Sequence, residues 1–471
     1  MKILLTGSNG YIGKRLLPVL IDMNYEIVCC VRDINRFHAP KEIRDKVEII
    51  ELDLLKDETL KNIPKDIDGA FYLVHSMSES KDYEKLEIKS AQNFCNTLNA
   101  TQVKHVVYLS GIINETNLSD HLSSRKNVEI ELNKGHFNTT TLRAGIIIGS
   151  GSASFEIIRD LVEKLPLMIT PIWLKTKCQP IGIYDVISFL SKTIFNNETY
   201  NKNYDIGGPD ILSYKEMLLG FSRVRNLNRK IFIVPVMTPK LSSYWLYFVT
   251  STSYKLAAAL VDSMKIEVVC RDQKINKILG IVPLGYQENL KKAFSRINSN
   301  NIISSWKDAY SSSGTKINIS KLVEVPSFGC FKDKRTKKFL NKEKCIDKIW
   351  NIGGENGWYY GNWLWRIRGL MDKMSGGVGL RRGRTNINSL NAGDALDFWR
   401  VIFANKKNGR LLLFAEMKLP GEAWLEFKIE NDVLTQTATF RPLGVWGRFY
   451  WYLVLPFHGF IFKGMLKKIT S

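Results

Sequence analysis

The sequence predicts an α/β fold, a doubly wound parallel sheet, that is followed by a separate α+β domain. Three observations predict it. Short apolar runs alternate with helix-like stretches from residue 2 to residue 142, which is typical of parallel strands joined by right-handed crossovers. A glycine-rich loop joins the first run to the first helix. The charge and tryptophan content then change near residue 320, which indicates a domain boundary in a chain of 471 residues.

Six strands are predicted in the N-terminal part of the chain. They cover residues 2–6, 25–31, 47–52, 70–74, 103–109 and 139–142. Helices are predicted after the first strand, as far as residue 22, and over residues 83–98 and 125–132. Most of the strands are rich in β-branched, leucine or aromatic residues, as strands buried on both faces of a parallel sheet are.

The loop after the first strand reads Gly7-Ser8-Asn9-Gly10-Tyr11-Ile12-Gly13. Glycines allow the backbone to turn sharply there and let peptide N–H groups approach a pyrophosphate. The helix that follows adds the positive end of its dipole. The spacing is G-x-x-G-x-x-G and not the commoner G-x-G-x-x-G, but its place between a strand and a helix predicts nucleotide binding. A tight structural turn is the alternative.

The residues after the second and third strands bear on the choice of nucleotide. Arginine at the end of the second strand accommodates a ribose 2′-phosphate, whereas an acidic residue there binds a free 2′-hydroxyl. Arg32 and Arg36 therefore predict NADP(H), and Asp33 keeps NAD(H) open as the alternative. Asp53 and Leu54 follow the third strand, where an adenine edge would be held.

Taken together, these motifs resemble the short-chain dehydrogenases/reductases, in their extended and atypical branches near the NmrA-like proteins and the 39 kDa subunit of respiratory complex I. Besides the glycine loop and the residues after strands two and three, the resemblance rests on Tyr108-Leu109-Ser110-Gly111, Leu142-Arg143-Ala144-Gly145, Gln179-Pro180-Ile181, Asp185-Val186 and Tyr204-Asp205-Ile206-Gly207-Gly208-Pro209. It covers about residues 1–295. It implies a Rossmann domain over residues 1–300, in which residues 146–300 form a small substrate-binding lobe.

The chain departs from this family at the catalytic pair. The family uses a tyrosine and a lysine four residues apart, in which the lysine lowers the pKa of the phenol that exchanges the proton. No Tyr-x-x-x-Lys occurs in the sequence. The resemblance makes Ser110 a catalytic candidate, with Arg125 or Lys126 in the electrostatic role of the lysine. His75, which follows the fourth strand and is also predicted beside the cofactor, and His121 are candidate proton donors, although a lone histidine is more often structural.

The C-terminal part has its own composition. Residues 331–471 hold 25 Lys and Arg against 12 Asp and Glu, a net charge of +13, whereas the first 330 residues have a net charge of +8. Eight of the eleven tryptophans lie beyond residue 349. We therefore predict a domain over residues 320–471, joined to residues 1–300 by a polar linker over 301–319.

Within this domain an edge strand is predicted at 332–339 and a helix at 342–351. Four consecutive strands follow at 398–404, 410–417, 423–429 and 434–441, and a long helix at 446–468. In the third of these strands Leu425, Phe427 and Ile429 alternate with polar residues or tryptophan. The order resembles the helix-grip fold of START-like (SRPBCC) domains, and motifs such as Ile352-Gly353-Gly354 look like an uncharacterised bacterial family fused behind such Rossmann proteins. The resemblance implies an apolar ligand cavity; the alternative is a core filled by the tryptophans.

Residues 449–462 form an almost uninterrupted apolar run in the last helix. Fourteen residues are too few to cross a bilayer comfortably, so a buried closing helix is predicted, with peripheral contact to an anionic membrane as the alternative. No nucleic-acid motif accompanies the basic charge, so no nucleic-acid partner is predicted. The seven cysteines contain no C-x-x-C pair, so we predict no metal site and a reducing, cytoplasmic location. Residues 1–6 are interpreted as a strand and not as a signal peptide.

Two classes of function follow from these expectations. The first is an NAD(P)-dependent oxidoreductase that acts on an apolar small molecule through an unusual active site. The second is a protein that binds NADP(H) without turnover, as a redox sensor or an assembly protein. The missing tyrosine favours the second class, and the retained Ser110 favours the first.

Overall fold

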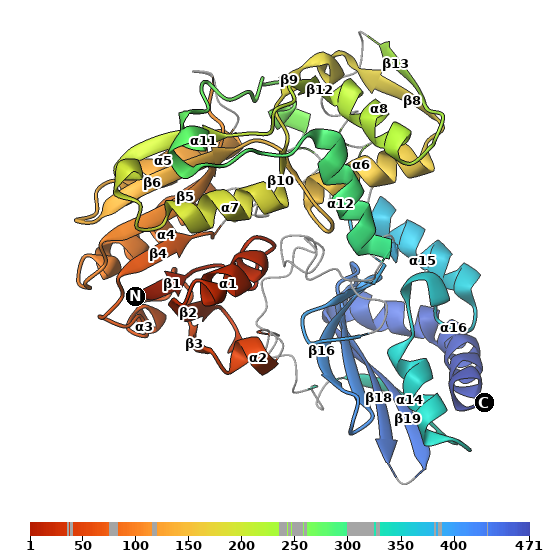
Figure 1. Cartoon of the computed structure of the whole chain (residues 1–471). Coiled ribbons are helices and arrows are strands. Elements are labelled where there is room, and N and C mark those ends of the chain that lie inside the picture. Colours follow the sequence, from red (N-terminus) through yellow and green to blue (C-terminus); the bar gives the residue numbers. More distant parts are fainter. Residues whose placement is uncertain are drawn as a thin grey trace. The chain divides into compact units, whose positions relative to one another are not determined.

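In the computed structural model the chain divides into two compact units, Met1–Trp306 and Lys307–Ser471 (Figure 1). The structure describes residues 1–34, 37, 41–74, 83–114, 120–234, 243, 246, 258, 261–298, 325, 330–380, 383–384, 389–430 and 432–471. Two of the residues singled out by sequence, Arg36 and His75, lie outside this part.

The first unit is built on a seven-stranded sheet in the order β11-β6-β5-β4-β1-β2-β3, and all of its strand pairs are parallel. The strands are β1 (Lys2–Leu5), β2 (Glu26–Val31), β3 (Val47–Glu51), β4 (Gly69–Tyr72), β5 (His105–Gly111), β6 (Asn138–Ala144) and β11 (Lys202–Ile206). The strand order reverses between β1 and β4. The predicted doubly wound parallel sheet is confirmed.

Helices cover both faces of this sheet because successive strand residues point to opposite sides. Ile3 and Leu5 of β1 pack with α1 (Gly13–Asp22), α7 (Ile183–Thr193) and α11 (Lys274–Leu279). Leu4 lies on the other face, in the core that includes residues of α4 (Tyr83–Leu98) and α5 (Asp120–Leu132). Two four-residue helices, α2 (Lys41–Arg44) and α3 (Asp57–Leu60), flank β3. The carboxyl ends of the strands are therefore the edge at which the connecting loops meet.

A smaller lobe follows β6 and has its own core. Its strands pair in twos: β7 (Ile147–Ile148) with β10 (Ile181–Gly182), β8 (Leu167–Pro171) with β13 (Lys230–Val234), and β9 (Lys177–Cys178) with β12 (Leu212–Ser213). Its helices are α6 (Ala153–Lys164), α8 (Tyr214–Val224) and α12 (Tyr286–Asn298). One phenylalanine from each helix meets the other two, with ring centroids 5.1 to 5.7 Å apart, so this core holds the three helices together.

The second unit is an antiparallel sheet of six strands in the order β14-β19-β18-β17-β16-β15. The strands are β14 (Phe331–Lys338), β15 (Ala395–Leu396), β16 (Trp399–Asn405), β17 (Arg410–Ala415), β18 (Gly421–Glu430) and β19 (Val433–Pro442). The helices are α14 (Lys342–Trp350), α15 (Asn362–Met374) and α16 (Gly444–Thr470). The predicted alternation along β18 is confirmed, because Leu425, Phe427 and Ile429 share one core and Trp424 lies on the opposite face.

One continuous core joins this sheet to its three helices. Tryptophan rings from three segments are at its centre: Trp358 lies 5.2 Å from Trp365 and 6.0 Å from Trp399 between ring centroids. The strand, helix, antiparallel strands and final long helix occur in the order read from the sequence. The likeness to START-like domains, and the ligand cavity that it implies, stay predictions.

Candidate functional site

The glycine loop lies where the strand order reverses, between β1 and β4. The Thr6 hydroxyl donates to the Phe71 carbonyl at 2.8 Å and accepts the Leu73 N–H at 3.1 Å, which joins the two strand ends. Gly7 follows with a φ of +67°, and a Cβ there would lie 2.8 Å from the Leu73 carbonyl oxygen. Only glycine combines this left-handed conformation with such a close backbone approach.

The rest of the loop leads directly into α1. The Gly10 N–H donates to the Gly7 carbonyl at 2.8 Å, and a Cβ on Gly13 would lie 2.8 Å from the Ser8 Cα. Within the described residues, no side chain caps α1 and its first turn holds no acidic residue. The positive end of the helix dipole is therefore not neutralised by the chain's own carboxylates there.

The side chains of the loop have different roles. The buried Ser8 hydroxyl donates to the Cys30 carbonyl at 2.7 Å, so it anchors the loop to β2. The Arg15 guanidinium carbon lies over the Tyr11 ring, 3.9 Å from the ring centroid. Burial raises the pKa of the Tyr11 phenol to about 12. Ile12 packs at the margin of the core beneath the sheet. Asn9 Oδ1 and the Tyr11 hydroxyl are both buried, and neither has a hydrogen-bond partner in the described part of the chain.

The ends of β2 and β3 bring the other predicted nucleotide residues to the same edge. Arg32 directly follows β2 and is exposed, whereas Asp33 is 4% exposed. Asp53 accepts the Leu55 N–H at 3.2 Å, and the carbonyl of the buried Leu54 accepts a hydrogen bond from Asn93 at 2.7 Å. The turn after β3 is therefore held by its own hydrogen bonds and by α4.

Ser110 and a contact of Arg125 both lie at the carboxyl end of β5. Ser110 is 3% exposed, and its hydroxyl has no hydrogen-bond partner among the described residues. Arg125 on α5 donates from Nη1 to the Leu109 carbonyl at 3.0 Å, while its buried Nε has no partner there. The guanidinium is thus fixed beside the residue that precedes Ser110.

The neighbouring candidates are placed differently. Lys126 is exposed, because consecutive helix residues point about 100° apart. His121 lies one turn before Arg125 in α5, and its side chain is outside the described part. Tyr108, two residues before Ser110, is buried; its hydroxyl donates to the Arg125 carbonyl at 3.4 Å. Burial raises the pKa of Tyr108, although the charge of Arg125 opposes this, so the phenol is protonated at neutral pH.

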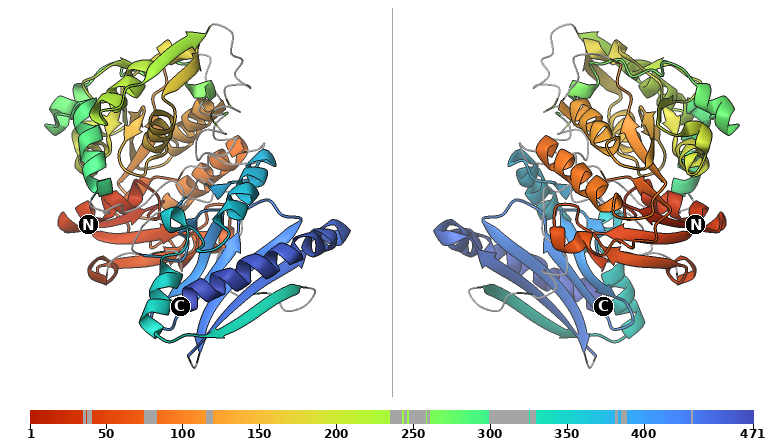
Figure 2. Two further views of the ribbon diagram at one scale, coloured as in Figure 1. Left: turned by 90° about the vertical axis from the view of Figure 1, so that its right-hand side faces the viewer. Right: turned by 90° about the vertical axis from the view of Figure 1, so that its left-hand side faces the viewer.

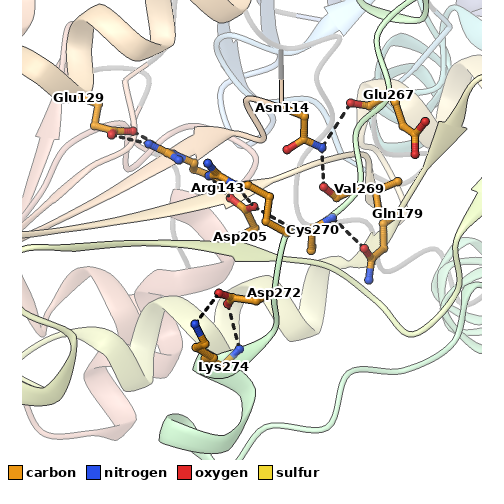
Figure 3. A network of polar contacts seen from close by, with 11 residues as sticks. Asn114, Glu129, Arg143, Gln179, Asp205, Glu267, Val269, Cys270, Asp272 and Lys274 are labelled. Atoms are coloured by element: carbon orange, nitrogen blue, oxygen red, sulfur yellow. Dashed lines mark hydrogen bonds and ion pairs between the residues drawn. The ribbon is translucent and has the colours of Figure 1, made fainter. Parts of the chain in front are cut away.

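A polar network beside this edge was not foreseen from the sequence (Figure 3). Arg143 on β6 forms a bidentate pair with Glu129 of α5, at 2.6 and 3.1 Å, and both residues are buried. Asp205 at the end of β11 holds Arg271 at 2.9 and 3.1 Å. Gln179 accepts the Cys270 N–H at 2.9 Å, so residues 270 and 271 are tied to the sheet and the lobe. Three motif residues of the family resemblance, Arg143, Gln179 and Asp205, thus have structural contacts.

A dinucleotide fits the chemistry of this edge. Asn9 Oδ1, Ser110 Oγ and Arg125 Nε are buried polar atoms without partners in the described part of the chain, and buried polar groups in native proteins are normally hydrogen-bonded. They lie along the carboxyl edge, beside a helix N-terminus and the point where strand order reverses. In open α/β sheets ligands bind at this place. Fold and site together therefore define a Rossmann-type domain with a candidate nucleotide site.

Comparison with known proteins supports this class. A family model described as the NAD dependent epimerase/dehydratase family matches residues 3–113, and one described as a protein of unknown function (DUF2867) matches residues 330–465. The chain is 24% identical over 248 residues to the photosystem II assembly factor Ycf39 of Trieres chinensis, an alignment that covers 52% of this chain and 75% of that protein.

A second relative is the chloroplastic divinyl chlorophyllide a 8-vinyl-reductase of Arabidopsis thaliana. It is 21% identical over 227 residues, which span 44% of this chain and about half (54%) of the reductase. Among solved structures, the NADPH-dependent quinone oxidoreductase QOR2 of Escherichia coli, complexed with NADPH, has a TM-score of 0.51 and 16% identity. The match covers 62% of this chain and 99% of the oxidoreductase, and at this identity it shows a shared fold.

Proposed function

We propose that the first unit binds NADP(H) at the carboxyl edge of its sheet and transfers hydride to or from an apolar small molecule at Ser110. The observation that carries the proposal is the set of three unpartnered buried atoms, Asn9 Oδ1, Ser110 Oγ and Arg125 Nε. The glycine loop and α1 would hold the pyrophosphate, and the Asn9 amide is placed at the same loop. A reductase and a quinone oxidoreductase among the similar proteins support the reaction class.

In this proposal NADPH supplies the hydride when it is bound. Ser110 would donate a hydrogen bond to the substrate oxygen on which negative charge develops. The fixed Arg125 guanidinium, held by the Leu109 carbonyl, would stabilise that charge from the same side. The described residues do not include a tyrosine on α5, so the proton would come from solvent or from another group.

The test is to mix the purified chain with NADPH and a panel of quinones, enones and other carbonyl compounds, and to follow the near-ultraviolet absorbance of NADPH. We expect enzyme-dependent consumption with at least one apolar acceptor. A chain that binds NADP⁺ in calorimetry but consumes NADPH with none of them would overturn the reaction and leave the binding.

That outcome would support a second candidate, a dinucleotide-binding protein without turnover. The specific observation in its favour is that α5 has no tyrosine to supply a proton. The described residues next to Arg125 are serine, lysine and asparagine. Ser124 is occupied in a hydrogen bond to Glu87, so it is not available to a substrate. The assembly factor among the relatives fits this alternative.

Arg32→Ala should remove most of a preference for NADP⁺ over NAD⁺. A charge-assisted hydrogen bond to phosphate contributes about 1.5–3 kcal/mol, so NADP⁺ affinity should fall roughly 10- to 100-fold while NAD⁺ affinity changes little. Calorimetric titration of both cofactors measures this. Arg225→Ala, at an exposed arginine of the lobe, is the matched control and should leave both affinities unchanged. Equal affinities of the unmodified chain for the two cofactors would contradict the prediction.

A further inference from the structure

The first half of α16 is apolar on its outer surface. Phe449, Leu453, Phe457 and Phe460 follow one another at spacings of four, four and three residues, so they form one stripe along the helix. Their exposed fractions are 61%, 60%, 53% and 54%, and Trp446 at the start of the stripe is 79% exposed. Exposed apolar surface of this extent marks an interaction site.

The opposite side of α16 is apolar too. Trp451 stacks between Phe331 and Phe440, with ring centroids 5.5 and 5.8 Å away. In the second half of the helix the apolar residues of the same side belong to the core of the unit: Ile461, Phe462, Met465, Leu466 and Ile469. A helix that is apolar on all sides is normally covered on all sides. The sheet covers one side of α16, and the outer stripe requires another apolar partner.

A second helix, α15, also has apolar residues on its outer surface. On α15 five exposed residues recur at helical spacing: Trp363, Ile367, Leu370, Met371 and Met374. Both helices pack on the same face of the sheet, because Trp365 of α15 and Phe462 of α16 belong to one core, with ring centroids 6.4 Å apart (Figure 2). We call the outer residues of the two helices the apolar helix face.

The exposed charges of the two helices are all positive, and the one carboxylate of the adjacent strand β14, Asp333, is paired with Arg335 at 2.9 Å. No residue of α16 is acidic, and Arg448, Lys463, Lys467 and Lys468 are exposed. The single carboxylate of α15, Asp372, is fully buried and accepts the N–H groups of Gly379 and Lys418. The face therefore matches an anionic apolar partner. If a second copy of the chain packed against this face, the lysines and arginines of the two copies would repel each other. Neither helix offers an exposed carboxylate to offset this repulsion.

The length of the apolar run determines how such a partner is contacted. Residues 449–462 extend over about 21 Å of helix, whereas a bilayer core is about 30 Å thick. Among the described residues, no helix combines the length and the apolar character that crossing a membrane requires. Tryptophan and other aromatic side chains bordered by lysine and arginine are typical of a helix that lies in the plane of a lipid surface.

We infer that the apolar helix face of α15 and α16 inserts into the surface of an anionic lipid bilayer, with the basic residues of α16 on the headgroups. The inference does not depend on the proposed reaction.

The test is flotation of the purified full-length chain with lipid vesicles at low and at high salt. One set of vesicles is phosphatidylcholine alone, and in the other about one lipid in three is the anionic phosphatidylglycerol. We expect binding to the anionic vesicles, which high salt weakens. The triple variant Phe449→Ser, Leu453→Ser, Phe457→Ser should bind at least about tenfold more weakly, because each side chain loses its burial in lipid.

The control is Ile169→Ser with Phe232→Ser, two exposed apolar residues of the first unit that face each other in the β8–β13 register. It should bind vesicles like the unmodified chain. Because the three α16 positions are exposed, the triple variant should keep its circular dichroism spectrum. Equal vesicle binding by the folded triple variant would overturn the inference. The inference would also be overturned if the unmodified chain bound no vesicles and instead self-associated through these residues.

Discussion

Glu416→Gln should lower the free energy of unfolding of the second unit by about 3–5 kcal/mol. Glu416 pairs with Arg400 across the β16–β17 hairpin at 2.8 Å, and their side chains are 0% and 1% exposed. Arg400 also donates to the Gly393 carbonyl at 2.8 Å. Removing the carboxylate charge takes from the buried guanidinium the anion that it pairs with at 2.8 Å, and breaking a buried ion pair is among the most destabilising single changes.

Chemical denaturation followed by tryptophan fluorescence measures this effect, because eight of the eleven tryptophans belong to residues 331–471. Glu422→Gln is the matched control: its pair with Arg441 is exposed and 3.5 Å long, so less than about 1 kcal/mol should be lost. The double variant Arg400→Met, Glu416→Leu should recover much of the lost stability, since neither charge of this pair is then buried. A loss from Glu416→Gln as small as that of the control would refute the prediction.

Ser110→Ala should slow turnover of the best acceptor about 100- to 1,000-fold, the loss observed when one hydrogen-bond donor to a developing oxyanion is removed. NADP⁺ affinity and stability should change little, because the described structure gives the Ser110 hydroxyl no hydrogen bond of normal geometry to lose. Steady-state kinetics with calorimetry of NADP⁺ binding separates the two effects.

Thr141→Val provides the control for this second prediction. Its hydroxyl is also buried and unpartnered in the described chain, but Thr141 lies deeper in the sheet, opposite Tyr108 in the β5–β6 register. Its turnover should equal that of the unmodified chain. Undiminished turnover in Ser110→Ala would exclude Ser110 from the reaction and shift attention to other groups at the same edge.

Local patterns were sufficient for much of the fold. The apolar runs predicted β1 to β6 to within a few residues, because a short buried strand is marked by its own side chains. They did not predict β11, whose sequence Lys202–Ile206 is mostly polar and pairs with β6 across about sixty residues. The apolar pattern also did not predict the helix α15. Its tryptophans and arginines lie on both the exposed and the buried side, so the sequence shows no clear apolar face there.

The sequence by itself determined the Rossmann order, the glycine loop and the polar residues after each strand, because strand ends and glycines are local signals. Only the tertiary structure decided which of the two adjacent candidates on α5, Arg125 or Lys126, contacts the end of β5. The packing of Val128 and Leu132 sets the rotation of that helix, which turns Arg125 toward β5 and Lys126 to solvent. Likewise, charged residues are expected at the surface. Only the register of the β16–β17 hairpin places Arg400 and Glu416 in the core, where their charges neutralise each other.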